Sequence, residues 1–180
     1  MSRFGGRGFI AFSEYDGFSV IEGQKQKLVA DINGQSDNYI LNVNKTEYVA
    51  HLVATYTISP IEIHSDQLSV STEERMIPAE MHPRSYHVYE GKSYPKDVYT
   101  FHLPFTGQAE LLKVRASTFS MSAPRIDVKG QEITFEFINF NTDAQSMKRE
   151  ADNTVSQLVS QNAYLTRDLT AFNNTIEQIA

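Results

Sequence analysis

The last segment of the chain constrains the fold most, because no proline or glycine occurs after Phe140. Apolar side chains there recur at alternating spacings of four and three residues, with Asp, Asn, Gln and Thr between them. This periodicity predicts one continuous amphipathic helix of about 38 residues within 141–180, about 57 Å long at 1.5 Å per residue. Thr142 with Gln145 offers a capping box at its start, and Asp143 suits the positive end of the helix dipole.

The apolar stripe of this helix predicts a pairing surface. A helix so rich in Thr, Asn and Ser is marginal in water on its own, so packing must hold it. We expect it to join two copies of the chain in a homodimer, with the lone seam residue Asn162 fixing the register. The expected pairing residues are Leu158, Asn162, Leu165, Leu169, Phe172, Ile176 and Ile179. The alternative, in which the helix lies along the chain's own sheet, remains open at this stage.

Residues 1–140 predict a separate α+β domain that begins with two packed helices. Apolar residues at near-helical spacing indicate a first helix over 13–32, with Asn33 and Gly34 as its stop. A second, shorter helix is expected after Asn44, whose side chain can cap the first turn while Glu47 reaches back as the other half of a capping box. Its apolar face consists of Tyr48, Val49, Leu52, Val53 and Tyr56.

Between Thr57 and Phe140 the apolar period changes from helical to two. Ile133, Phe135 and Phe137 alternate with polar residues, and similar short runs precede them, so we predict an antiparallel or mixed, half-buried sheet. Glycine supplies the positive φ of a tight turn, so the Lys129–Gly130 dipeptide fits a hairpin between the last two strands. The expected fold is therefore α+β: this sheet, two packed helices and the long C-terminal amphipathic helix.

No linear signature of catalysis, metal binding or cofactor binding is present. The chain lacks cysteine, its histidines form no i, i+4 helical pair, and the glycine-rich and serine motifs of nucleotide binding and hydrolysis are missing. We therefore expect no metal and no cofactor. One loop could still assemble a ligand site from His82, Arg84, His87 and Tyr89, while His102 is expected on the solvated face of its strand.

The charge balance disfavours anionic partners. Sixteen Lys and Arg against 22 Asp and Glu leave a net charge of −6, so binding to nucleic acid or anionic lipid would need a local basic patch. Arg3 and Arg7, set among glycine and phenylalanine, resemble an arginine-glycine segment, although an N-terminal strand over Phe9–Phe12 is the simpler interpretation. No apolar run reaches the roughly 20 residues of a membrane span, and we expect a cytoplasmic protein without membrane contact.

Six short segments, taken as a set, resemble the N-terminal region of large, poorly characterised bacterial proteins. The segments are Met1–Ala11, Tyr39–Asn44, Pro104–Gly107, Ala116–Phe119, Met147–Asp152 and Ala171–Asn174. In such proteins the C-terminal part carries an effector, such as a TIR-like or restriction-endonuclease-like domain. The resemblance implies a sensing, scaffolding or oligomerising front end, possessing no catalytic residues of its own, in a chain that continues past Ala180.

Three functions are consistent with the sequence. The first is a non-catalytic interaction module at the front of a larger, defence-type bacterial protein. The second is a small enzyme or ligand-binding domain with a site built from loops. The third, nucleic-acid binding through the N-terminal arginines and the basic loop residues, is weakened by the acidic net charge.

Overall fold

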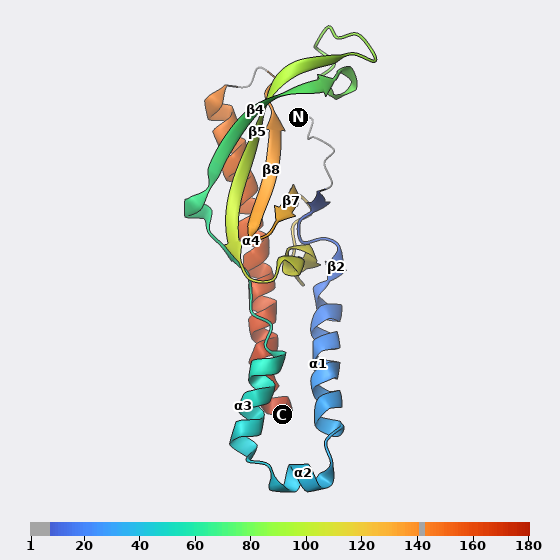
Figure 1. Cartoon of the computed structure of the whole chain (residues 1–180), viewed down its shortest axis with the longest axis vertical. Helices are drawn as coiled ribbons and strands as arrows, with labels where there is room; N and C mark the ends of the chain where they lie inside the picture. The colour runs from blue at the N-terminus through green and yellow to red at the C-terminus, as the bar shows by residue number, and fades with distance from the viewer. Residues whose placement is uncertain (1–7, 141–142) are drawn as a thin grey trace.

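The computed structural model describes residues 8–140 and 143–180, and it is an α+β fold as the sequence predicts. The molecule is elongated, with a curled antiparallel sheet at one end and a group of helices at the other (Figure 1). One long helix, α4, runs through both ends. We call the two ends the sheet half and the helical half.

The sheet half is built around β5, the longest strand. The strand order is β1, β7, β8, β5, β3, and β4 also pairs with β5. All of these pairings are antiparallel. The bounds are β1 Phe9–Ile10, β3 Glu62–Ile63, β4 Ser69–Pro78, β5 Ser93–Thr106, β7 Arg125–Lys129 and β8 Glu132–Ile138, with short 3₁₀ turns at Ser65–Gln67, Ala79–Met81 and Ala109–Lys113.

The predicted inward face of the last strand is confirmed. Ile133, Phe135 and Phe137 are all buried, whereas Glu136 between them is only partly covered. The hairpin before this strand is confirmed too, with Gly130 at a φ of 60°. Alternation of period two therefore identifies the inward face of this strand, although Thr134 and Ile138 on the other face are buried as well.

The long helix is shorter than predicted and does not continue to the end of the chain. α4 spans Ala144–Asn173, and a separate turn of helix, α5, covers Ile176–Ile179. The Thr175 hydroxyl donates to the carbonyl oxygen of Phe172 at 2.7 Å, so a side chain competes for a helical acceptor at the break. The N-cap is Asp143, which accepts from the Ser146 N–H at 2.8 Å, while Thr142 lies outside the described residues.

The stripe assigned to homodimer formation is instead this chain's own core. Leu158, Leu165 and Leu169 pack against the sheet, and Phe172 and Ile176 pack against the other helices. Ile179 is partly buried in the same helical cluster. The stripe is therefore not a free pairing surface, because a dimer through it would have to open the core of each copy. Self-association of the chain stays a prediction that needs another surface.

Asn162 has a different role from the one its seam position suggested. Its Nδ2 donates to the carbonyl oxygen of Ile61 at 3.0 Å, just before β3. The polar seam residue thus satisfies a backbone acceptor within the same chain.

The helical half contains α1 (Gly17–Asn33), α2 (Asp37–Asn42) and α3 (Lys45–Tyr56) beside the C-terminal part of α4 (Figure 1). The first helix starts at Gly17, not near Ser13, because Tyr15 and Asp16 form a short strand, β2, parallel to β6 (Val114–Arg115). Gly17 passes so close to this strand that a Cβ would lie 2.5 Å from the Arg115 carbonyl oxygen.

The other helix boundaries follow the sequence except for one missed element. The helix after Asn44 is confirmed, and the Asn44 side chain accepts from the N–H groups of Thr46 and Glu47. Gly34 ends α1 as expected. The sequence interpretation missed α2, a six-residue helix capped by Ser36 at the far end of the molecule.

Candidate functional site

The loop proposed as a ligand site does not bring its residues together. His82 turns inward, where its Nδ1 lies 3.0 Å from the Pro78 carbonyl oxygen and its ring packs against Tyr94 and Phe140. Arg84, His87 and Tyr89 are exposed. His82 therefore anchors the loop to the end of the sheet, and the four side chains do not form a common site.

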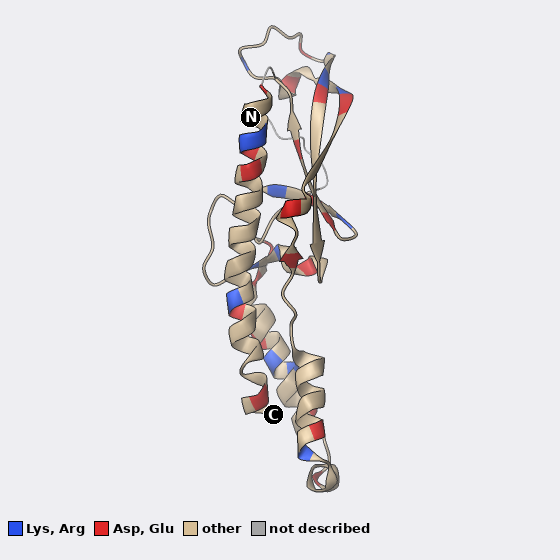
Figure 2. Ribbon diagram, turned by 90° about the vertical axis from the view of Figure 1, so that its left-hand side faces the viewer, with Lys and Arg blue, Asp and Glu red and all other residues tan. Residues whose placement is uncertain are grey.

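The polar side chains of the molecule gather instead on the open face of the sheet. α4 lies against the opposite face (Figure 2), where Phe101, Phe135 and Phe137 form a ring cluster. Because side chains alternate along each strand, residues from β4, β5 and β8 meet on the face turned away from α4. The members of this polar cluster are Ser71, Glu73, Arg75, Thr100, His102, Glu132 and Glu136.

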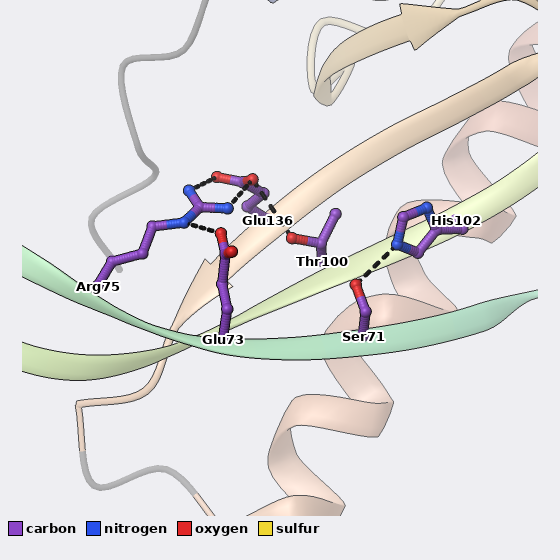
Figure 3. Close-up of polar contacts among 6 residues, drawn as sticks. All are labelled: Ser71, Glu73, Arg75, Thr100, His102 and Glu136. Carbon is purple, nitrogen blue, oxygen red and sulfur yellow. Dashed lines mark hydrogen bonds and ion pairs between the residues drawn. The ribbon is translucent and has the colours of Figure 1, made fainter.

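One part of the polar cluster is an ion pair across three strands (Figure 3). The Arg75 guanidinium donates two hydrogen bonds to Glu136, at 2.9 and 2.7 Å, and it also binds Glu73 on its own strand. The Thr100 hydroxyl donates to the same Glu136 carboxylate at 3.3 Å. The hydrogen bonds from Arg75 hold the pKa of Glu136 below its ordinary value, so this carboxylate is charged at neutral pH.

The other part is a hydrogen-bonded chain from a serine through a histidine to a carboxylate. Ser71 Oγ lies 2.8 Å from His102 Nε2, and His102 Nδ1 lies 2.9 Å from Glu132 Oε1. His102 is on the polar face of β5, as the sequence predicts, but it is not simply solvated. The order of groups is that of a nucleophile, a base and a carboxylate that orients the base.

A pocket of about 150 Å³ lies beside the Ser71–His102–Glu132 hydrogen bonds, where β7 and β8 separate. β7 pairs with β8 only over Asp127–Lys129, and at Arg125 and Ile126 it pairs with β1 instead. The pocket is lined by His102 and Glu132 on one side and by Arg125 and Lys129 on the other. Basic and acidic groups both face it, so the lining does not select a ligand of one charge.

The outer side of β4 is an open edge of the sheet. β4 pairs with β5 along ten residues, and no strand among the described residues pairs with its other side. The Ala79 N–H donates to the Lys92 carbonyl oxygen in the continuation of this ladder, so odd-numbered residues of β4 face β5. The N–H and C=O groups of Val70, Thr72, Glu74 and Met76 therefore point outward. We call these four residues the β4 edge.

Sequence reasoning missed most of this site. Ser71, Arg75 and Glu136 are not among the site residues that the sequence predicts. The hydrophilic residues of each strand were visible as the polar half of an alternating pattern, but the pattern does not say which strands lie side by side. Arg3 and Arg7, named for nucleic-acid binding, lie outside the described residues.

Known proteins offer no guide to this site. Comparison of the chain with protein-family models, with curated proteins and with solved structures finds no match. Within residues 8–140 and 143–180, no three His, Asp or Glu side chains converge as a metal site would require. In the same ranges, none of the helices combines the length and apolar character of a membrane span.

Proposed function

We propose that this chain is a non-catalytic interaction module at the front of a larger bacterial protein, and that it binds its partner by strand addition to the β4 edge. The observation that carries the proposal is the length of this edge. An edge strand with a row of unpaired backbone groups is a template for another extended segment, which gains affinity from main-chain hydrogen bonds and specificity from alternate side chains.

The side chains of β4 support this function. Val70 is 53% exposed and Met76 is 61% exposed, and both lie on the face that turns toward α4 elsewhere in the sheet. An added strand would cover them and extend the apolar face by one strand. On the polar face the same strand would meet Ser71, Glu73 and Arg75, which present both charges and a hydroxyl group.

The test is selection of extended peptides from a displayed random-peptide library on the immobilised chain. Thr72→Pro removes an outward N–H without touching the β5 ladder, whereas Thr72→Ala keeps it and serves as the matched control. We expect selected peptides to bind the parent and Thr72→Ala but to lose at least about tenfold in affinity on Thr72→Pro, the equivalent of one or two main-chain hydrogen bonds. Equal binding to all three proteins would reject the β4 edge as the site.

A second candidate function is ester hydrolysis at Ser71, favoured by the Ser71–His102–Glu132 geometry. Ser71 Oγ would attack the ester carbonyl carbon while its proton passes to His102 Nε2, and His102 would then protonate the leaving alcohol. A water molecule that gives its proton to His102 would next attack the acyl group on Ser71, and the returning proton would restore the serine as the acid leaves. This candidate ranks second because the serine lies on an open face in water, where developing negative charge gains little from preorganised donors.

The hydrolase candidate has a simple test with a matched control. Turnover of p-nitrophenyl acetate should be lost in Ser71→Ala and kept in Ser69→Ala, since Ser69 is a neighbouring exposed serine on the same face of β4. A parent protein that is no faster than buffer alone would remove this candidate and leave the interaction module as the function.

A further inference from the structure

We infer that the partner strand is β4 of a second copy of this chain, an inference that rests on the proposed function of the β4 edge. On the face of β4 that carries the even-numbered residues, the pattern of apolar and polar side chains is symmetric about Glu73. Val70 and Met76 lie three residues to either side, and polar Thr72 and Glu74 lie one residue to either side. A strand with this symmetry is self-complementary when two copies meet antiparallel across a twofold axis.

The outward N–H and C=O groups of the β4 edge lie at the positions that this antiparallel pairing requires. With the axis at Glu73, Thr72 lies opposite Glu74 of the second copy, and Val70 lies opposite Met76 of the second copy. These are the residues whose N–H and C=O groups point outward, so each such pair exchanges two main-chain hydrogen bonds. Glu73 and its counterpart form a non-hydrogen-bonded pair, in which the Cα atoms are closest, about 4.5 Å apart.

The exposed apolar side chains gain a partner in this register. Val70 and Met76 are on the same face of β4. The twofold axis places Val70 of one copy beside Met76 of the other, and Met76 of the first beside Val70 of the second. Two Val70–Met76 contacts result, one at each end of the paired segment. Cross-strand neighbours of this kind lie about 4.5–5.5 Å apart at Cβ and stabilise sheets pairwise.

The charges at the axis define the register further. Glu73 meets Glu73 of the second copy, which is the one directly opposed pair of like charges. Arg75 of each copy stands diagonal to Glu73 of the other, at the roughly 7–8 Å that a long side chain can reach. Arg75 already donates two hydrogen bonds to Glu136 of its own chain, so it offsets only part of this repulsion, and neutralising Glu73 should strengthen the assembly.

Cross-linking tests the register cleanly because the chain has no cysteine. Three single-cysteine variants are compared under mild oxidation: Thr72→Cys, Glu73→Cys and Glu74→Cys. A disulfide needs Cα atoms about 4.4–6.8 Å apart. Glu73→Cys should form covalent dimers, because the two introduced cysteines lie directly opposite each other. Thr72→Cys and Glu74→Cys should not, because their two cysteines would be opposite only if the register shifted by two residues. Dimers from Thr72→Cys or Glu74→Cys in preference to Glu73→Cys would overturn the inference.

Light scattering supplies the second measurement. The parent, with a chain mass of 20.4 kDa, should double its mass as concentration rises, and Thr72→Pro should stay monomeric. Glu73→Gln should tighten the dimer about two- to fivefold, and Glu74→Gln should not. A parent that stays monomeric while library peptides still bind would overturn the homodimer and leave the proposed function standing. A parent that neither dimerises nor binds peptides would overturn both.

Discussion

The sheet half and the helical half share α4 but are held together very differently. In the sheet half, one cluster of twenty buried residues joins the strands to α4 through side chains such as Leu158 and Leu165. In the helical half, the described core consists of four buried residues: Leu28, Leu52, Phe172 and Ile176. A single amphipathic stripe therefore serves two partners, a sheet along most of its length and two helices at its end.

The difference between the two cores indicates which half contributes most of the free energy of unfolding. Buried apolar area is the main stabilising contribution, so the sheet half is the cooperative unit of the fold. The helical half buries few side chains, and most of its residues are exposed or only partly covered, which are the properties of a region that opens locally. We expect amides of α1 and α3 to exchange with solvent before those of β5 and β8.

Two aspartate substitutions on α4 should have the largest effects, and these effects should differ between the two halves. Leu165→Asp places a carboxylate in the apolar sheet core and should cost about 4 kcal/mol or more, enough to unfold the whole chain. Phe172→Asp should melt only the helical half and leave the sheet folded. Circular dichroism reports the loss of helix, and amide exchange in β5 reports the sheet.

The control for this pair is Val159→Asp, because Val159 is an exposed residue of α4. It adds the same charge to the same helix and should leave both halves intact. If Leu165→Asp instead kept its sheet folded, the sheet half would not depend on α4, and the proposed division of stability would be refuted.

A second prediction concerns the junction between the halves. Asn173 binds Ile58 twice: its Nδ2 donates to the Ile58 carbonyl oxygen at 2.9 Å, and its Oδ1 accepts from the Ile58 N–H at 3.0 Å. Asn173→Ala removes both bonds and should cost about 1–3 kcal/mol. The loss should appear as earlier opening of α3 by hydrogen exchange, with the exchange of β8 amides little changed.

Asn174→Ala is the matched control for the junction, since Asn174 is the next residue along and its side chain is exposed. It should leave α3 protection unchanged. Equal effects of the two substitutions would mean that the end of α4, and not the double hydrogen bond to Ile58, couples the halves.

The sequence predicted local features well because they are encoded locally. Alternation over Ile133–Phe137 and the Asn44 cap each depend on neighbours within a few residues, and both are confirmed. The face of α4 that becomes buried was also predictable. Its partner was not, because apolar spacing specifies which side of a helix avoids water and contains no information on whether a sheet or a second helix covers it.

The candidate site could not be predicted for a related reason. Arg75 and Glu136 are 61 residues apart in the chain and meet only because β4 and β8 flank β5. Single-sequence patterns place strands but not their order. The loop around His82 looked more promising in the sequence because its histidines are close along the chain, yet proximity in sequence did not make their side chains converge.

A third prediction concerns how the stability of the sheet half depends on pH. The pKa of Glu136 is lowered in the folded state, so its contribution to stability is fully present above the ordinary value of 4.5 and is lost as pH falls through the lowered pKa. Glu136→Gln should cost about 1–2 kcal/mol near neutral pH. In urea titrations, the gap between parent and variant should close as the pH falls below 4.5 and through the lowered pKa of Glu136.

Glu74→Gln controls for the change in net charge, because Glu74 is exposed on the other face of β4. It should leave the urea midpoint nearly unchanged at both pH values. The effect of Glu136→Gln should be confined to the sheet half, so the local exchange of α3 amides should be unchanged. A gap between parent and Glu136→Gln that stays constant on acidification would contradict a role for the charged carboxylate.

The smallest expected effect comes from making the same change in both halves. Asp143 caps α4 over the sheet and Asn44 caps α3 in the helical half, and alanine at either position removes the capping acceptor and should destabilise its helix slightly. Asp143→Ala should lower the global unfolding midpoint, because α4 belongs to the main core. Asn44→Ala should instead raise local exchange in α3 and leave that midpoint almost unchanged.

The pKa of Asp143 is lowered by the hydrogen bond from the Ser146 N–H, so this cap weakens as pH falls through that lowered pKa, whereas the Asn44 cap does not titrate. Asp143→Asn keeps a good cap without the charge and should abolish the acid sensitivity. If Asn44→Ala lowered the global midpoint as much as Asp143→Ala, the two halves would unfold as one unit and the distinction between them would fail.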